Sequence, residues 1–458
     1  MRISSRVQYV EAQPLVRDSV LASRALVSNG RFVVGDTVVT CPSGEEYCYF
    51  YGSGSTLKTY PSVLDLDLNV FGLGVEGLRF YANTRFQTAF GADDNYWPIQ
   101  PEIGLLNAYA ELNRKSYRVR LGRDYNVSSF GFYGYDGGSA LVRFTPWWTQ
   151  LELYGGRALA RGLPVPVNSS IFDDPLGELK PQDDNWLIGF RASARPTSNA
   201  SLELNYQRQW TGTGSDIARE QVGLEGSWYV TPAVSLLGHM DYDLAYGEFG
   251  KSGLKAGWQI NPMFYVEGGY LRYRPVFSTQ QIWYAFSPVA YNGWNVSGGV
   301  RALPNLNFKL WVEQRKYEDT GAEVSYFTTT DDDWRMGIRG TWGINEQWEL
   351  DGGYWRNHGF GAALNSGDLR VGFQAHEQLS LGARFIAWQQ LEEFRVNEGR
   401  VWGFGLDARW RTQQGTVWFS VDRYDHDNRG DGAVQDWNQW RSALGFSYYL
   451  GSEPGRTP

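Results

Sequence analysis

The chain has 458 residues, of which 16% are aromatic and 54 are glycine, with only 4 methionines and 2 cysteines. This composition suits pleated, half-buried strands better than helices. The net charge of -8 excludes functions that need a strongly basic surface, such as nucleic-acid binding. Apolar stretches of only a few residues exclude a helical membrane protein, whose spans need ~20 apolar residues each.

A transmembrane β-barrel is compatible with the mean hydropathy of -0.42, because its lipid-facing residues alternate with polar residues that face the lumen. The chain starts with the polar Met1-Arg-Ile-Ser-Ser-Arg6 and lacks the roughly 7–15 apolar residues of a secretory signal. We therefore expect that a targeting segment was removed before this numbering begins, or that the start is misannotated.

Apolar and polar residues alternate with a period of two along the whole chain, which predicts strands. In 64–70, leucines and a valine occupy one face, while Asp65 and Asp67 lie on the other. The same alternation recurs in segments such as 78–87 and 402–411, again with the charged residues on one side. A soluble β-protein would also alternate, so the pattern alone does not separate it from a barrel.

The connections between these segments alternate in length, which favours the barrel. Tight turns such as Asn261-Pro262 and Pro304-Asn305 carry turn-forming residues. The intervening connections are longer and more polar, and we expect loops over 13–58, 91–101, 128–138, 161–184, 211–216, 279–291, 318–332, 359–367 and 425–436. Short periplasmic turns and long extracellular loops are typical of outer-membrane barrels.

The sequence therefore predicts an all-β fold, a transmembrane up-and-down antiparallel β-barrel of about 22 strands (20–24), integral to a bacterial outer membrane. One barrel would cover residues 1–452, with both termini periplasmic and a tail over 453–458. Loops 13–58 and 161–184 are long enough to fold inward. Acidic clusters in the outer loops would contact lipopolysaccharide through divalent cations, and the wall would contact outer-membrane lipid.

Cys41 and Cys48 are the two cysteines, and both fall in the first long loop. An even pair in an oxidising compartment usually forms a disulfide, so we expect this pair to staple the loop. A redox or metal role is the alternative.

The stretch 117–155 carries Leu121-Gly-Arg-Asp124 in a strand pattern, then Gly134-Tyr-Asp-Gly137, then two further alternating segments. It resembles outer-membrane porin-like barrels, including the alginate-export type, in which a Leu-Gly-Arg-Gln strand precedes an Asp-Gly loop. Asp124 stands where that pattern usually has Gln. The resemblance implies a porin-like outer-membrane barrel, but it does not imply a particular substrate.

The chain contains no sequence motif for catalysis or for metal binding, so we expect neither an enzyme nor a metal site. The four histidines, at 239, 358, 376 and 426, are scattered. The acidic segment 425–432 superficially resembles a calcium loop, but Arg429 replaces a ligand and the closing glutamate is missing. The haem-attachment motif Cys-x-x-Cys-His is absent, so haem could enter only through a partner.

Charged residues on the polar face are predicted to line the lumen and to tune which solutes pass. The candidates are Asp65, Asp67, Arg79, Arg85, Arg118, Arg120, Asp124, Arg335, Arg339, Asp407 and Arg409. The alternative is that opposite charges on neighbouring strands pair and stiffen the wall. Aromatic residues beside the tight turns, such as Trp228, Trp342 and Trp348, are expected to form an interfacial girdle.

Three functions fit these observations. Twenty-two strands spaced ~4.8 Å and tilted ~40° enclose a barrel of roughly 44 Å, which must be constricted by loops or filled by a partner. The first hypothesis is a channel for passage or export of solutes. The second is the sheath of a porin-cytochrome electron conduit, holding a periplasmic multihaem cytochrome or lipoprotein. The third is a soluble carbohydrate-binding β-protein.

Overall fold

The structure is a computed structural model, and it describes residues 1–12, 15–28, 31–35, 37–41, 44, 46–53, 55–91, 103–159, 185–210, 217–274, 290–318, 332–358, 365–390, 399–428 and 437–451. The predicted loop 161–184 and the tail 453–458 lie outside the described residues.

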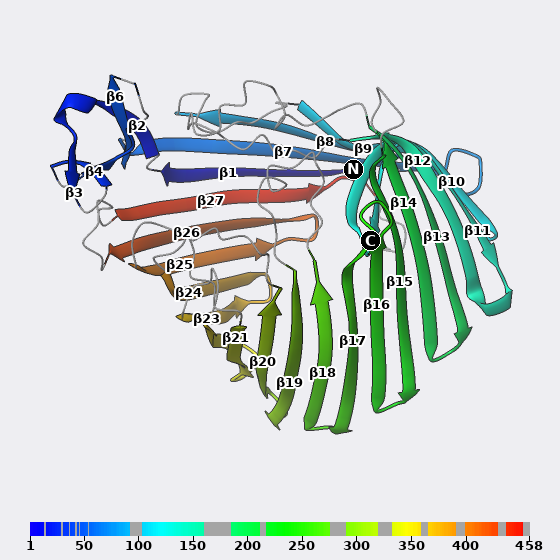
Figure 1. The fold of residues 1–458 in the computed structure, drawn as a ribbon. Coiled ribbons are helices and arrows are strands. Elements are labelled where there is room, and N and C mark those ends of the chain that lie inside the picture. The colour runs from blue at the N-terminus through cyan, green and yellow to red at the C-terminus, as the bar shows by residue number, and fades with distance from the viewer. Residues whose placement is uncertain are drawn as a thin grey trace.

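Within the described residues, twenty-two antiparallel strands form one closed sheet (Figure 1). They are β1 (Arg2–Ala12), β7 (Leu57–Phe71), β8 (Leu78–Phe90), β9 (Ile103–Asn113), β10 (Tyr117–Ser128), β11 (Gly131–Phe144), β12 (Thr149–Ala158), β13 (Trp186–Thr197), β14 (Ala200–Trp210), β15 (Ile217–Thr231), β16 (Val234–Asp243), β17 (Glu248–Asn261), β18 (Phe264–Tyr273), β19 (Tyr291–Leu303), β20 (Leu306–Tyr317), β21 (Asp332–Gly343), β22 (Trp348–His358), β23 (Asn365–His376), β24 (Leu379–Gln390), β25 (Gly399–Arg411), β26 (Gly415–Asn428) and β27 (Trp437–Tyr449). The predicted barrel and its strand number are confirmed.

Strand β1 closes the barrel, because it pairs with β27 on one side and with β7 on the other. The remaining strands pair with their neighbours in sequence, which makes an up-and-down meander. The Met1 ammonium donates a hydrogen bond to the Leu450 carbonyl over 2.8 Å, so the first and last wall strands meet at the end of the barrel that carries the tight turns.

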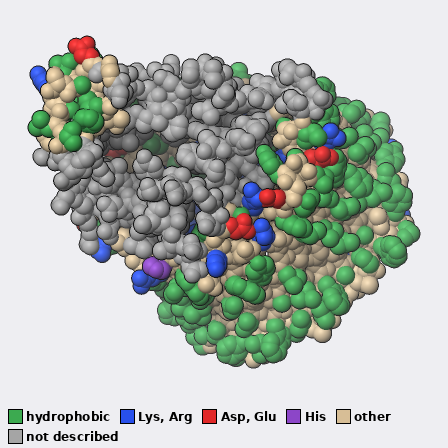
Figure 2. Space-filling view, viewed as in Figure 1, with side chains coloured by type: hydrophobic (Ala, Val, Ile, Leu, Met, Phe, Trp, Pro, Cys, Tyr) green, Lys and Arg blue, Asp and Glu red, His purple; other side chains and the backbone are tan. Residues whose placement is uncertain are grey.

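The outer face of the wall is apolar. Leu121, Leu254, Trp294 and Val296 are each more than half exposed on this face, although they sit in the middle of strands. Figure 2 shows hydrophobic side chains spread over the right and lower parts of the outer surface, where few charged side chains appear. Because side chains alternate between faces, the polar residues of the same strands point into the barrel.

The tight turns are held by side chains that accept hydrogen bonds from the next backbone amides. The Asn261 side-chain oxygen accepts from the amides of Met263 (2.8 Å) and Phe264 (2.9 Å), and Asn345 holds its turn in the same way. Asn and Asp favour such turns for this reason. Gly77 closes another turn with φ of +73°, where a side chain would collide with the Asn113 carbonyl.

The first long loop folds into small sheets of its own. Two strands pair as a hairpin, β2 (Leu15–Leu21) with β6 (Tyr47–Ser53), and three more form a second sheet, β3 (Leu26–Ser28), β4 (Arg31–Val34) and β5 (Thr37–Val39). A one-turn 3-10 helix, η1 (Ala22–Arg24), links them. In Figure 1 these elements lie at the end of β1 and β7 remote from the chain termini. Cys41 and Cys48 form the predicted disulfide.

The predicted loop over 128–138 is wrong. Strands β10 and β11 pair without interruption up to Ser128 and Gly131, so only Ser129 and Phe130 form the turn. Glycine, tyrosine and aspartate in this stretch suggested a loop, but they lie in β11. Strand β26 likewise continues to Asn428, so the acidic segment that begins at Asp425 starts inside a strand.

Helices are minor in the described part of the chain. Besides η1, a second one-turn 3-10 helix, η2 (Pro146–Trp148), joins β11 to β12. No helix among the described residues is long and apolar enough to span a membrane.

The two faces of one strand provide a test of the wall. Val296 lies on the outer face of β19, and Asn295 lies next to it on the inner face, opposite Glu313. We expect Val296→Arg to lower the free energy of unfolding in phospholipid vesicles by about 2–4 kcal/mol, because it places a charge against lipid. Asn295→Arg adds the same charge on the wet side and serves as the control. Urea titrations in vesicles measure both, and equal losses would contradict this assignment of faces.

Candidate functional site: the lumen wall and its inward-folded hairpin

Glu111 of β9 is a deeply buried charge in the wall, with a side chain that is 1% exposed. It lies between two arginines: the Arg79 guanidinium of β8 is 2.8 Å away and the Arg120 guanidinium of β10 is 2.6 Å away. Arg120 also contacts the Asp124 carboxylate at 3.0 Å, and its guanidinium lies over the Tyr109 ring. Two arginines around one buried carboxylate thus tie three strands together.

A second chain of ion pairs continues around the wall. The Arg118 guanidinium contacts Glu152 of β12 at 2.7 Å, Glu152 lies 3.9 Å from Arg191 of β13, and Arg191 donates to Glu203 of β14 over 3.0 Å. The register places these residues on one face, because Glu152 lies opposite both Leu141 and Arg191. Alternating charges on β10, β12, β13 and β14 therefore form a chain of ion pairs inside the barrel, which passes over Leu141 of β11.

The structure places the remaining predicted lumen charges on the same face. Arg85 binds Asp65 at 2.7 Å, and Asp67 accepts from the Tyr81 hydroxyl over 3.0 Å. Further on, the pairs are Arg335 with Asp333, Arg339 with Asp351 and Asp368, and Asp407 with Arg370. Arg409 is different, because it makes no ion pair within the part of the chain that the structure describes.

The β10–β11 hairpin leaves the wall halfway along its length. Strand β9 pairs with β10 only as far as Ala108 and Arg123, yet β9 continues outward to Ile103 beside β8. On its other side, β11 pairs with β12 up to Tyr135 and Ala158, and the Leu159 amide donates to the Gly134 carbonyl over 2.9 Å where the described residues end. The Arg123 guanidinium donates to the Leu105 carbonyl over 2.9 Å and binds Asp136, and so caps the break in the ladder.

The tip of this hairpin packs on the inner face of nearby wall strands. The Arg191 guanidinium donates to the Val127 carbonyl over 2.8 Å, and the Arg219 guanidinium lies 5.6 Å from the centre of the Tyr133 ring. Phe130, at the turn, is 9% exposed. These contacts join β10 and β11 to β13 and β15, which are not their neighbours in the wall.

Glycine at position 223 makes room for this contact. A β-carbon on Gly223 would lie 2.6 Å from the Ser129 hydroxyl and 2.8 Å from the Phe130 ring, so any side chain there would push the hairpin away. Asp241, next to Gly223 on β16, is buried beside the same turn. The inner wall is therefore shaped to receive the hairpin tip.

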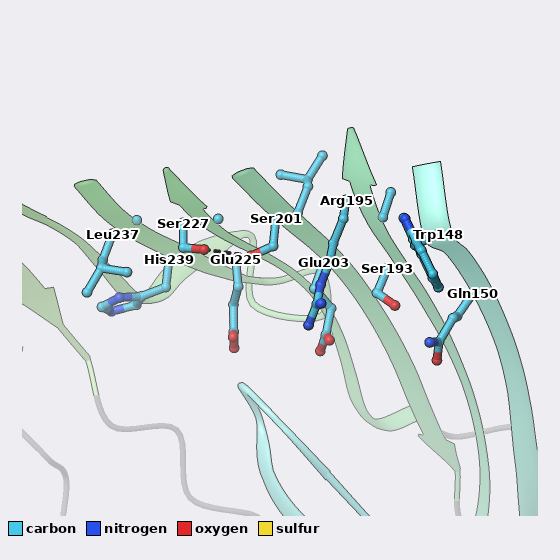
Figure 3. Close-up of a pocket in the computed structure, with 14 residues that line it drawn as sticks. Trp148, Gln150, Ser193, Arg195, Ser201, Glu203, Glu225, Ser227, Leu237 and His239 are labelled. Carbon is cyan, nitrogen blue, oxygen red and sulfur yellow. Dashed lines mark hydrogen bonds between the residues drawn. The ribbon is translucent and has the colours of Figure 1, made fainter. Parts of the chain in front are cut away.

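The inner wall also carries a cavity of about 560 Å³, which residues of β12 to β16 line. Figure 3 shows Glu203 and Glu225 pointing to the same side of the wall, with His239 beside them. The Ser201 and Ser227 hydroxyls hydrogen-bond to each other over 2.6 Å at its edge. No group of three or more metal-ligating side chains occurs among the described residues.

The predicted aromatic girdle is distributed between the two faces. Trp228, Trp342 and Trp348 are exposed near the tight turns. Tyr449 instead points inward, where the Arg2 guanidinium lies 5.6 Å from its ring centre. Sequence reasoning missed the hairpin contact, although Phe130, Phe132 and Tyr133 inside a glycine-rich loop were a signal that this loop packs on something.

Comparisons with known proteins assign no family. No protein-family model and no curated protein matches the chain. Among solved structures, Acinetobacter baumannii OccAB2 is 9% identical, with 98% of this chain and 97% of that chain covered and a TM-score of 0.39. The Pseudomonas aeruginosa ferric enterobactin receptor PfeA is 10% identical, with 98% of this chain and 81% of that chain covered and a TM-score of 0.49. The P pilus usher PapC translocation pore is 8% identical, with 98% of this chain and 100% of that chain covered and a TM-score of 0.47. At these identities and scores the matches assign no function to the chain.

The Glu111 cluster leads to a stability prediction. Glu111→Gln keeps the shape of the side chain but leaves Arg79 and Arg120 facing each other in a half-buried site. We expect a loss of about 2–3 kcal/mol in the free energy of unfolding. Glu76→Gln is the matched control, because Glu76 also binds an arginine at 2.7 Å but is 92% exposed, where an ion pair contributes little. Unfolding in urea measures both, and an unchanged midpoint for Glu111→Gln would show that the cluster is not structural.

Proposed function

We propose that the protein is a porin-like channel of a bacterial outer membrane, through which polar solutes pass passively. Three features support the proposal: a closed sheet with no free edge, an apolar outer face and a charged inner face. A closed barrel satisfies every backbone hydrogen bond in lipid, which an open sheet cannot do. The observation that carries the proposal is the packing of the hairpin tip on the inner face of the wall, because a segment held there would narrow the wide barrel.

The tight-turn end would face the periplasm and the ends of β10 and β11 would face outward, as is usual for such barrels. The proposal takes the hairpin as a constriction, and the inward folding of the long loops 13–58 and 161–184 stays a prediction. The contact with lipopolysaccharide and lipid stays a prediction that belongs to this proposal. Extraction tests the alternative of a soluble carbohydrate-binding protein: a barrel in the membrane needs detergent for extraction, and a soluble protein does not.

The sheath of an electron conduit is the rival proposal. A cytochrome inside the barrel would have to share the lumen with the β10–β11 hairpin, which lies against β13 and β15. The sheath predicts haem absorbance in the complex purified from its native membrane. Haem absorbance together with a silent planar bilayer would favour the sheath over the channel.

Removing the hairpin tip tests the channel. Asp124 and Tyr135 lie opposite each other in the register, so residues 125–134 can be replaced by Asn-Gly, which favours a two-residue hairpin turn. We expect a larger single-channel conductance in planar bilayers, because the constriction is gone.

The control shortens a turn at the same end of the barrel, where residues 244–247 join β16 to β17. Replacing them with the same Asn-Gly should leave the conductance unchanged. If the hairpin deletion conducts like the wild type, the hairpin is not the constriction, and if neither protein conducts, the channel proposal fails.

A further inference from the structure

Several lumen arginines lack an ion pair with any described residue, and four of them lie together in one place. Lumen arginines on β8, β10, β13, β21 and β24 each bind a carboxylate, as Arg384 binds Asp422 at 2.5 Å. Arg2, Arg6, Arg409 and Arg411 lie close together at the tight-turn end, and none of the four makes an ion pair with any described residue. All four line one hollow of about 470 Å³.

The closure of the barrel brings these four residues together. Arg409 and Arg411 end β25, while Arg2 and Arg6 begin β1, and β26 and β27 lie between the two strands. Three strand spacings separate the two arginine pairs by ~14 Å of backbone. Because the long arginine side chains extend toward the same hollow, one ligand of moderate size can reach both pairs.

The floor between the pairs is flat and carries hydroxyl groups. The Trp418 ring lies across Gly445, since a β-carbon on Gly445 would be 2.5 Å from that ring. Thr416 and Ser447 border it with hydroxyl groups. A carbon skeleton or ring can lie on the Trp418 surface while the hydroxyls bind polar substituents.

The ligand groups that fit the four guanidinium groups are anionic oxygen atoms. Guanidinium groups bind carboxylate and phosphate with two parallel hydrogen bonds, and these charge-assisted bonds are stronger than neutral ones. The hollow offers one carboxylate, Asp65, and Arg85 binds it at 2.7 Å. The four other guanidinium groups are left to a ligand.

We infer that Arg2, Arg6, Arg409 and Arg411 form a binding site for organic solutes that carry two or more carboxylate or phosphate groups. The inference rests on the proposed channel function only for how the ligand reaches the site.

Isothermal titration calorimetry of the detergent-purified protein tests the site, with citrate as the carboxylate probe and pyrophosphate as the phosphate probe. We expect saturable binding of at least one probe that weakens with added salt. The double variant Arg409→Ala/Arg411→Ala should lower the affinity by at least about tenfold, because it removes two charge-assisted contacts. Whichever probe binds more tightly identifies the preferred group.

Arg301→Ala is the matched control. Arg301 lies near the tight-turn end of β19, makes no ion pair with any described residue and is remote from the hollow. This variant should bind like the wild type. Equal affinities for the wild type and the double variant, or no binding of either probe, would overturn the site.

Conductance of the same samples in planar bilayers separates the two proposals. Steady conductance without probe binding leaves the channel standing and rejects the site. Probe binding that the double variant loses, in a protein that does not conduct, supports the site and rejects the channel. A heat-dependent shift in gel mobility checks that each variant has folded as a barrel.

Discussion

The pairing of β1 with both β27 and β7 is the constraint on which the rest of the structure depends. It removes the two free edges that a 22-stranded sheet would otherwise expose, and with them the unpaired amides and carbonyls that neither lipid nor a soluble monomer tolerates. Once the sheet is closed, each strand has one inner and one outer face. The alternation of the sequence then decides the chemistry of both surfaces.

Closure also determines the electrostatics of the lumen. Arginine and carboxylate side chains on adjacent strands meet in the low dielectric of a narrow polar layer, and pairing such as Arg118 with Glu152 compensates their loss of water. Many of the lumen charges pair across the wall, as the second reading of these charges predicted, while the arginines around Trp418 make no ion pair with any described residue.

Much of the fold could be predicted from the sequence because strand alternation is local. The residues at 64–70 show both the strand and the face of Asp65 without knowledge of any partner. The partners themselves could not be predicted, because register depends on turn geometry, and a slip of one residue exchanges the faces. Glu111, which joins two predicted lumen arginines, was therefore not recognised as the centre of a cluster. The arginine hollow needs residues from both ends of the chain.

The error over 128–138 has a physical cause that bears on function. Glycine and aspartate usually mark loops, but a hairpin that leaves the wall must bend. Its glycines also allow close contact between strands, because a β-carbon on Gly137 would collide with the Gly155 carbonyl. Its polar face then packs on the charged inner wall instead of facing open water, as the bond from Arg191 to the Val127 carbonyl shows. The same alternation that builds the wall thus makes the hairpin fit the inside of the barrel. In the proposed channel, an extension of the wall itself would narrow the wide lumen.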